Sequence, residues 1–405
     1  MKHETDSRRW RMLVLLSAAE LLGMSLWFTA SAAAPQLQAL WSLSPSETAL
    51  LATAVQMGFV AGTALAAVLN LADLLPARAY FAVCALLGAA ANAALAWAPS
   101  YSAALGLRFL TGMFLAGVYP PAMKMMATWF RTARGMAIGV LVGALTVGKA
   151  APYLFRVLEP ADYQSVLFAA SGCAAAGALL VAWGYREGPF SFEQRPFSWR
   201  LAGEVLRHRE TRLATAGYLG HMWELYAMWT WVPAFLLASL HEHTAHHSNA
   251  HLHLSGLADG LAFGAIAAGG LGCVWGGLVA DRIGRERTVN VAMAASGLCA
   301  LLIGLTFGGN PWLVGALTWL WGFFVVADSA QFSALVTEVA PRHAVGTALT
   351  LQTSLGFLLT TVTIQLIPAL VQQVGWRWAF AVLAFGPMAG IAAIVRLAAL
   401  RRRPH

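Results

Sequence analysis

The sequence predicts an all-α membrane protein with twelve transmembrane helices in two pseudo-symmetric six-helix bundles. Composition, the spacing of apolar runs and an internal repeat support this prediction. Of the 405 residues, 59% are hydrophobic and only 11% are charged, against roughly 25% charged in an ordinary soluble domain. A span takes about 20 apolar residues, so the hydrophobic residues, about 239 of 405, suffice for about twelve spans. Polar residues are too few to cover a soluble protein, which excludes a soluble enzyme, a nucleic-acid-binding domain and a disordered chain.

The apolar runs form two sets of six, separated by one long polar stretch. Each run is expected to be helical, because the bilayer core offers no hydrogen-bond partner to backbone groups. The runs lie at 12–34, 47–69, 79–98, 102–128, 135–157 and 163–185, and then at 212–240, 255–280, 288–308, 311–336, 345–372 and 376–397. We therefore expect an amino-terminal bundle (1–185), a cytoplasmic central loop (186–211) and a carboxy-terminal bundle (212–405).

The basic residues predict the orientation of the chain. The net charge is +8, and nearly all loop arginines and lysines fall on the side that holds both termini and the central loop. The other side has only Arg156 and Arg377. The positive-inside rule therefore puts both termini in the cytoplasm, in a bacterial-type inner membrane. This topology accounts for the excess of basic residues, so we expect the protein to contact membrane lipid and not nucleic acid. We also expect a monomer.

The two halves carry matching sequence patterns. The pattern ELxxMxxWxxA begins at Glu20 and again at Glu224, an offset of 204 residues. Ala72-Asp73 matches Ala280-Asp281 at an offset of 208, and the fourth spans of the two halves match at 210. Three matches in order at nearly constant offset favour two parallel repeats, with the solute path at their interface near mid-membrane.

The most specific motif is GGLVADRIGRER at residues 276–287, between the eighth and ninth predicted spans. It resembles the loop signature of the major facilitator superfamily, and the resemblance covers nearly the whole chain. It implies a gating clasp made of Gly277, Asp281, Arg282, Gly284 and Arg285. Glycines allow close helix approach, the aspartate faces a helix amino end, and the arginines pair with acids or carbonyls. The alternative is a basic, topology-setting turn.

The first-half copy of this motif, residues 69–78, is degenerate. It keeps Asp73 and one arginine but lacks the glycines and the Asp-Arg pair. The region from Arg108 to Gly139 resembles the span 4–5 region of anion-handling branches of the superfamily, which include nitrate/nitrite and organic-anion porters. The glycine-rich nitrate signature is absent from the fifth span, so nitrate itself is not expected.

Ionisable side chains within spans are costly and favour a functional interpretation. Six stand out: Glu20, Arg108, Lys124, Lys149, Glu224 and Asp328. The superfamily resemblance implies that five of them, on spans 1, 4, 7 and 10, face the central cavity. Similar depths predict an ion pair between Glu20 and Lys124.

We expect the three basic residues, Arg108, Lys124 and Lys149, to bind an anionic solute. The three acids, Glu20, Glu224 and Asp328, are the candidates for proton coupling, since burial disfavours a charged carboxylate. The alternative is a set of salt bridges that only fix helix packing, with Arg108 joining span 4 to span 1.

Uncharged candidates complete the predicted substrate site. Trp27 and Trp231 are expected to wall it, and Tyr119 precedes Pro120-Pro121, where a bend in span 4 frees a carbonyl. Gln331 and Gln352 are further candidates. Packing, or an interfacial aromatic belt, is the alternative for the tryptophans.

The segment 241–253 carries six of the eleven histidines. The HxH pairs His241/His243 and His251/His253 are weak candidates for a metal site. Irregular spacing without cysteines favours a solvated loop, so no metal and no cofactor are expected.

These features together predict a secondary active transporter. It would move a small solute, an anion, by alternating access coupled to protons. The alternative is a proton-driven efflux pump for cationic or amphipathic compounds, and a non-transporting sensor is a third class. No nucleophile–base pair or phosphate-binding loop is present in the sequence, which argues against an enzyme and against ATP-driven transport.

Overall fold

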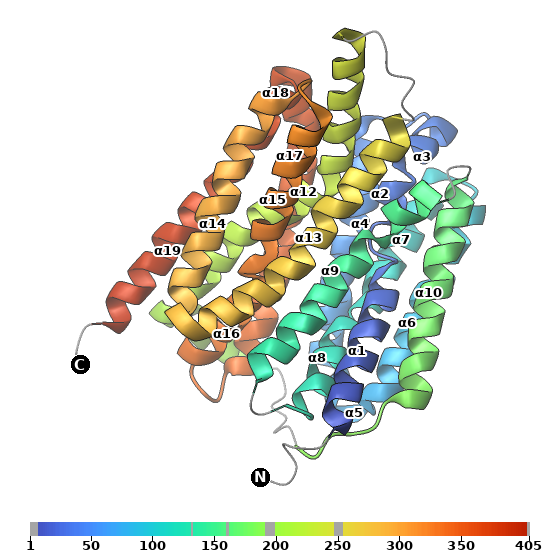
Figure 1. The fold of residues 1–405 in the computed structure, drawn as a ribbon. Coiled ribbons are helices and arrows are strands. Elements are labelled where there is room, and N and C mark those ends of the chain that lie inside the picture. Colours follow the sequence, from blue (N-terminus) through green and yellow to red (C-terminus); the bar gives the residue numbers. More distant parts are fainter. Residues whose placement is uncertain (1–6, 131–132, 159–161, 191–198, 247–253, 403–405) are drawn as a thin grey trace.

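The computed structural model describes residues 7–130, 133–158, 162–190, 199–246 and 254–402. Within these ranges the chain is helical, with connecting turns and no strands. Figure 1 shows two helical bundles side by side, one from the first half of the chain and one from the second. Each bundle contains six long helical segments, as the apolar runs predict.

The amino-terminal bundle is built around helices that are interrupted in two places. Its six segments are α1 (Arg8–Met24) with α2 (Thr29–Ala32), α4 (Pro45–Val68), α6 (Ala77–Ala94) with η1 (Leu95–Trp97), α7 (Tyr101–Leu115) with α8 (Tyr119–Ala127), α9 (Arg134–Leu158) and α10 (Tyr163–Gly184). Two short helices, α3 (Ala34–Trp41) and α5 (Leu71–Leu74), lie in connections. The breaks in the first and fourth segments leave backbone carbonyls that other groups must satisfy.

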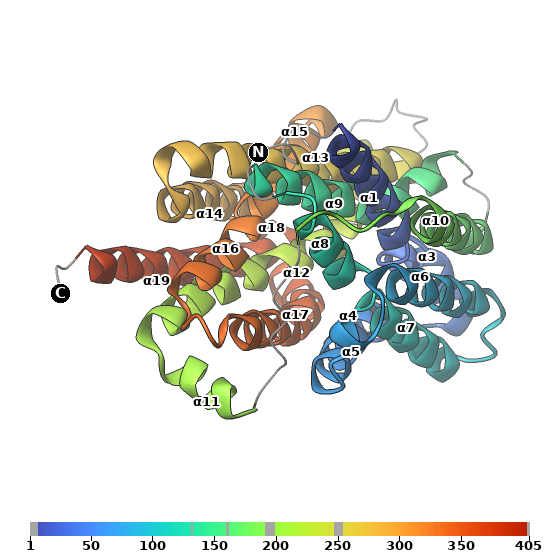
Figure 2. The same cartoon turned by 90° about the horizontal axis from the view of Figure 1, so that it is seen from below.

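The carboxy-terminal bundle repeats this plan. Its segments are α12 (Arg209–His246), α13 (Leu254–Ile283), α14 (Arg285–Leu302) with η2 (Ile303–Thr306), α15 (Pro311–Ala327) with α16 (Ser329–Val339), α17 (Val345–Val374), and α18 (Trp376–Ala379) followed by η3 (Phe380–Ala384) and α19 (Phe385–Arg401). Within the expected central loop lies a short helix, α11 (Trp199–Arg207), which packs on the side of α12 and α17 (Figure 2).

Ten of the described helical segments are long and apolar enough to cross a membrane. The other two coincide with the predicted spans at 12–34 and 212–240. The first is α1, whose 17 residues end at the break before α2. The second is α12, which has 38 residues but whose apolar run is interrupted by polar side chains, among them His221 and Glu224. The chain is a multi-pass membrane protein.

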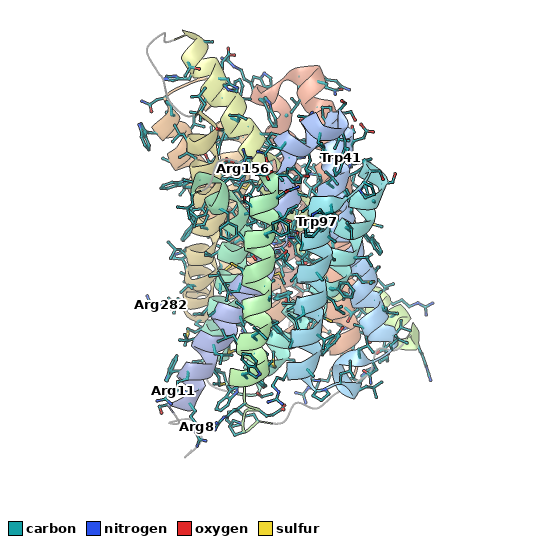
Figure 3. All side chains as sticks on the ribbon, turned by 90° about the vertical axis from the view of Figure 1, so that its right-hand side faces the viewer. Arg8, Arg11, Trp41, Trp97, Arg156 and Arg282 are labelled. Atoms are coloured by element: carbon teal, nitrogen blue, oxygen red, sulfur yellow. The ribbon has the colours of Figure 1, made fainter. Side chains whose placement is uncertain are left out.

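Three of the four arginines labelled in Figure 3 lie toward the same end of the molecule. Figure 3 shows Arg8, Arg11 and Arg282 toward one end, and Arg156 and Trp41 toward the other. The first residues of α1 and the last of α19 lie at the same end (Figure 1). This is the arrangement that the distribution of loop charges predicts.

The bundles meet along two seams. In one, α9 packs against α13, and in the other α4 packs against α17. Glycines allow the first seam to be close: a Cβ on Gly143 would lie 2.9 Å from the carbonyl oxygen of Gly270, and one on Gly270 would lie 3.0 Å from that of Gly143. In the second seam, the rings of Phe59 and Phe357 have centroids 4.6 Å apart.

Candidate functional site

A cavity of about 60 Å³ lies between the two bundles, and we call it the inner cavity. Helices α1, α4, α8 and α9 contribute from one half, and α12, α15, α16 and α17 from the other. Its lining includes Met24, Trp27, Phe59, Tyr119, Lys149, Tyr218, Tyr226, Trp229, Ser329, Ser333, Thr353 and Phe357. The inner cavity therefore lies at the interface where the two repeats predict a solute path.

Lys149 is the only charged residue among the described residues that line the inner cavity. It is 3% exposed, and its ammonium group donates a hydrogen bond to the hydroxyl of Tyr226. The same nitrogen lies 4.0 Å from the centroid of the Trp27 ring and 5.4 Å from that of Trp229. Aromatic faces attract a cation most strongly where water is excluded. The two halves of the protein together thus form an aromatic cage around one ammonium group.

Helix α9 orients Lys149 through its periodicity. Val142, Leu145, Thr146 and Lys149 recur at helical spacing and line the same cavity. The neighbouring Gly148 packs so tightly on α1 that a Cβ there would lie 2.2 Å from a backbone oxygen of that helix. A glycine at this position therefore lets α9 approach α1 closely.

Glu20 is fully buried on α1, and neither of its carboxyl oxygens has a hydrogen-bond partner among the described residues. Leu21, the next residue of α1, packs against Gly148, which precedes Lys149 on α9. The predicted ion pair between Glu20 and Lys124 is therefore wrong for this structure. Lys124 lies partly buried on α8 and does not line the inner cavity.

Arg108 is fully buried on α7 and binds the break in the first segment. Its guanidinium donates to the carbonyl oxygens of Leu26 (3.1 Å) and Trp27 (2.5 Å). It also donates to Thr29 (2.9 Å) and Asn92 (3.1 Å). These bonds satisfy carbonyls that a continuous helix would have paired. Arg108 does not line the inner cavity, and the geometry fits the alternative interpretation, in which it joins span 4 to span 1.

Glu224 lies inside the carboxy-terminal bundle rather than in the inner cavity. Its Oε1 accepts a hydrogen bond from Nε1 of Trp321 at 2.6 Å, and its Oε2 accepts one from Ser296 at 2.8 Å. Glu224 therefore does not line the inner cavity here, and its place on the solute path stays a prediction. A fully hydrogen-bonded carboxyl between α12, α14 and α15 instead ties these helices together.

Asp328 also lies away from the inner cavity, at the junction of α15 and α16. Its Oδ1 is 2.8 Å from Nδ1 of His221, and both side chains are buried. Asp328 likewise does not line the inner cavity here, and its role in proton coupling stays a prediction. Sequence reasoning missed His221, although it lies three residues before Glu224 in a predicted span. The cavity-lining Tyr218 packs on His221 with ring centroids 5.9 Å apart.

The uncharged residues predicted to bind the solute do not all line the same cavity. Trp27 and Tyr119 line the inner cavity, and Tyr119 begins α8 directly after the break in the fourth segment. Trp231 lines a second cavity, described below, and donates a hydrogen bond to a backbone carbonyl of α17 at 2.8 Å. Gln352 is buried on α17, and its amide atoms have no partner among the described residues.

The predicted clasp lies between α13 and α14. Gly284 has φ +89°, a conformation that favours glycine, and it allows the sharp turn into α14. Arg285 then reaches α16, where Nε donates to Glu338 at 2.6 Å and Nη1 to Gln331 at 2.8 Å. Gln331 is thus a partner of the clasp and does not line the inner cavity. These contacts all lie within the carboxy-terminal bundle.

Asp281 and Gly277 face the other bundle. Oδ1 of Asp281 lies 3.9 Å from the position of a Cβ on Gly135, in the first turn of α9, where a carboxylate is favourable. A Cβ on Gly277 would lie 3.7 Å from the carbonyl oxygen of Gly135. Arg282 is exposed (Figure 3). Asp73 belongs to α5, but its side chain lies outside the described residues.

The histidine-rich segment is described only in part. His241 and His243 lie on the last turns of α12, and Nδ1 of His243 is 3.4 Å from the carbonyl oxygen of Gly308. His251 and His253 lie outside the described residues. Over the described ranges, no three or more His, Cys, Asp or Glu side chains group closely enough to hold a metal ion.

A larger cavity of about 350 Å³ lies toward the end of the molecule that holds Arg156, and we call it the outer cavity (Figure 3). Its lining includes Ser31, Gln38, Tyr153, Arg156, Thr230, Trp231, Leu237, His241, Asp259 and Trp376. Nε of Arg156 on α9 lies 3.3 Å from Oδ2 of Asp259 on α13, so an ion pair crosses between the bundles beside this cavity.

Two bundles of apolar helices that enclose cavities at their interface define a membrane transporter rather than an enzyme. The chain belongs to the Major Facilitator Superfamily, whose family profile matches residues 15–363 and, in a second match, 244–405. No curated relative matches the chain by sequence.

Solved structures share this fold at low sequence identity. One is a nucleoside transporter, NupG, with a TM-score of 0.72 and 13% identity over 95% of this chain and 99% of that one. Another is a bacterial homologue of the human lysosomal transporter Spinster, solved inward-facing and unoccupied, with a TM-score of 0.65 and 15% identity over 98% and 96% of the two chains. Its inward-facing, occupied structure matches equally well, with a TM-score of 0.65 and 16% identity. None of these structures is named for an anion-handling branch, so that assignment stays a prediction.

Proposed function

We propose that this protein is a secondary active transporter that moves a small anion by alternating access, with Lys149 as the counter-charge. One observation carries the proposal: a single ammonium group lies in a cavity lined by both bundles. A buried ammonium group that lines a cavity and has no carboxylate hydrogen-bonded to it among the described residues attracts a diffusible anion. Tyr226 and Trp229 belong to the opposite bundle, so the contacts of Lys149 change when the two bundles move relative to each other.

The neighbouring Glu20 supports coupling to protons. Its carboxyl group is buried without a hydrogen-bond partner among the described residues, and the adjacent Leu21 packs against Gly148, which precedes Lys149. One ammonium balances one negative charge. When a solute anion occupies Lys149, Glu20 therefore takes up a proton, and it gives the proton up when the anion leaves. Anion and proton then move in the same direction.

The distribution of charge supports an orientation. We infer that both termini, α11 and the clasp face the cytoplasm of an inner membrane, and that the outer cavity faces the opposite side. The division into a bundle at 1–185, a central loop at 186–211 and a bundle at 212–405 follows the same inference. The two bundles would rock about the inner cavity, which both line.

The test uses purified protein reconstituted into liposomes with a pH gradient, inside alkaline. We expect uptake of small organic anions, and we expect Lys149→Gln to lower the rate at least roughly tenfold, since a charge-assisted contact is lost. The matched control is Arg11→Gln, which removes one exposed basic charge outside the cavity and leaves uptake unchanged. Normal anion uptake by Lys149→Gln would overturn the proposal.

The same liposomes decide the alternative, a proton-driven pump for cationic compounds. The buried carboxyl group of Glu20, which has no hydrogen-bond partner among the described residues, favours it, since a buried carboxylate can hold an organic cation. Glu20 lines neither cavity here, so this function requires an arrangement of the bundles that exposes it to the solute. Export of a lipophilic cation such as tetraphenylphosphonium, undiminished in Lys149→Gln and lost in Glu20→Gln, would establish that function instead.

A further inference from the structure

We propose that the outer cavity is a second binding site on the same path, for a carboxylate with an apolar body. This inference rests on the proposed function and narrows its substrate to organic anions. The site differs from the inner cavity in size and lining: about 350 Å³ against about 60 Å³. Small-molecule sites typically enclose roughly 300–1,000 Å³.

One face of α9 links the two cavities. Lys149, Tyr153 and Arg156 are spaced four and then three residues apart, so they share one face of the helix. Lys149 lines the inner cavity, while Tyr153 and Arg156 line the outer one. At 1.5 Å rise per residue, the two basic residues lie roughly 10 Å apart along the axis. An anion that leaves Lys149 can therefore bind next to Arg156 after moving only this distance.

The outer cavity has hydrogen-bond donors that the protein itself leaves unused. The buried hydroxyl group of Thr230 has no partner among the described residues, and the buried hydroxyl of Tyr153 has Ser31 as a polar neighbour but makes no well-formed hydrogen bond to it. Arg156 uses Nε for Asp259 and Nη1 for the carbonyl oxygen of Ala32, at 2.5 Å, so neither bond uses its Nη2. A buried polar group without a partner costs free energy, which a bound ligand recovers. These donors match a carboxylate, because a guanidinium and hydroxyls all donate to its two oxygens.

The rest of the lining fits an apolar body. The rings of Trp231 and Trp376 lie with centroids 6.5 Å apart, and Pro233 and Leu237 belong to the same wall. A water molecule occupies roughly 30 Å³ in the liquid, so a small inorganic anion would leave most of this apolar space filled with water. An organic cation is disfavoured, because Arg156 already neutralises Asp259, the acid that would receive it.

The experiment measures binding of 2-naphthoate and of acetate to purified Lys149→Gln protein by titration calorimetry. Removing Lys149 isolates the outer site. We expect one molecule of 2-naphthoate to bind, at least roughly tenfold more tightly than acetate, since the ring buries apolar area. Adding Arg156→Gln and Asp259→Asn together, which leaves no lone buried charge, should weaken binding at least roughly tenfold.

Two single variants guard against misfolding. Tyr153→Phe removes one hydroxyl and keeps the ring, and it should weaken 2-naphthoate binding by roughly two- to tenfold. Asp259→Asn frees Arg156 from its partner, so binding should hold or tighten. All variants are compared only where their size-exclusion profiles match that of the wild type.

The outcomes separate this inference from the function on which it rests. If Lys149→Gln protein binds no 2-naphthoate, or if the Arg156/Asp259 double change leaves binding intact, the outer site is disproved while anion transport can still hold. If wild-type protein transports no anion but 2-naphthoate binding still depends on Arg156 and Tyr153, the outer site stands and the proposed transport function fails.

Discussion

The ammonium group of Lys149 donates a hydrogen bond to the hydroxyl of Tyr226, and this bond joins the two halves of the protein. Lys149 belongs to α9 in the first bundle and Tyr226 to α12 in the second. Around the bond, Trp27 and Trp229 present their rings from opposite halves. Any rocking of one bundle against the other changes this cage, so binding of an anion at Lys149 and the arrangement of the bundles are energetically linked.

Removing the hydroxyl of Tyr226 should strengthen anion binding. Tyr226→Phe keeps the ring, and with it the cation–π contact, but deletes the acceptor that competes with the solute for the ammonium group. One hydrogen bond contributes about 0.5–1.5 kcal/mol, so the anion concentration for half-maximal uptake should fall by roughly two- to tenfold. Initial rates in liposomes over a range of anion concentrations measure this. A rise in that concentration would mean that the hydroxyl itself binds the solute.

Neutralising Glu20 should uncouple transport from the pH gradient. In Glu20→Gln the side chain stays neutral, as it does when protonated, so no proton is taken up when the anion binds. We expect uptake driven by the pH gradient to disappear, while exchange of labelled for unlabelled anion continues. Both are measured in the same liposomes. Gradient-driven uptake at the wild-type rate would exclude Glu20 as the coupling group.

Glu224→Gln is the matched comparison, because Glu224 occupies the equivalent place in the second repeat. Its carboxyl group is already bonded to Trp321 and Ser296, away from the inner cavity. An amide oxygen can replace only one of those two acceptor oxygens, so we expect a lower melting temperature and an unchanged response to the pH gradient. If Glu224→Gln protein has a normal melting temperature but its uptake no longer depends on the pH gradient, Glu224 takes part in proton coupling.

The fold could be predicted from composition and periodicity, whereas the roles of the charged residues could be predicted only in part. The repeat makes Glu20 and Glu224 look equivalent, yet their partners come from other helices, which the repeat does not specify. Lys149 was predicted to bind solute, and the structure gives it a cavity. The contribution of Tyr226 was missed, although it lies two residues after Glu224 in a predicted span.

A break in the fourth helical segment explains why the distance of Glu20 and Lys124 from the ends of their spans did not correctly predict an ion pair between them. Glu20 and Lys124 lie at similar distances from one end of their spans, but the fourth segment is interrupted between α7 and α8. Such a break rotates everything that follows it, so the residues after it face another direction than a straight helix gives them. Tyr119-Pro120-Pro121 indicated the break, but not the angle through which Lys124 turns.

Replacing Arg108 should destabilise the protein more than it alters substrate specificity. Arg108→Leu leaves the carbonyl oxygen of Trp27 without this donor, and the oxygens of Leu26 and Asn92 must then share the single hydroxyl proton of Thr29. Each buried unsatisfied group costs about 1–3 kcal/mol. Arg108→Lys keeps the charge but not the planar fork of donors, so its loss should be intermediate. Thermal unfolding in detergent, followed by tryptophan fluorescence, measures both. A normal melting temperature with altered solute preference would instead place Arg108 in the substrate site.

The close seam between α9 and α13 yields the last prediction. A Cβ at Gly143 would lie 2.9 Å from the carbonyl oxygen of Gly270, so Gly143→Leu forces the two bundles apart there. Overpacking should destabilise the state in which α9 and α13 are in contact by about 1–3 kcal/mol. The population of the state in which these two helices are separated should therefore rise roughly tenfold. Cys273, buried on α13 beside this seam, is a native reporter. Its rate of alkylation by N-ethylmaleimide, followed by mass spectrometry, should rise by a similar factor.

Two controls make this measurement specific. Gly172→Ala introduces a methyl group on α10, where nothing lies within 4 Å of the new Cβ, so alkylation of Cys273 should not change. Cys299 is buried on α14, within the carboxy-terminal bundle, and its alkylation should stay slow in both variants. A rise at both cysteines would indicate general unfolding. An unchanged rate at Cys273 in folded Gly143→Leu protein would show that this seam does not open during the transport cycle.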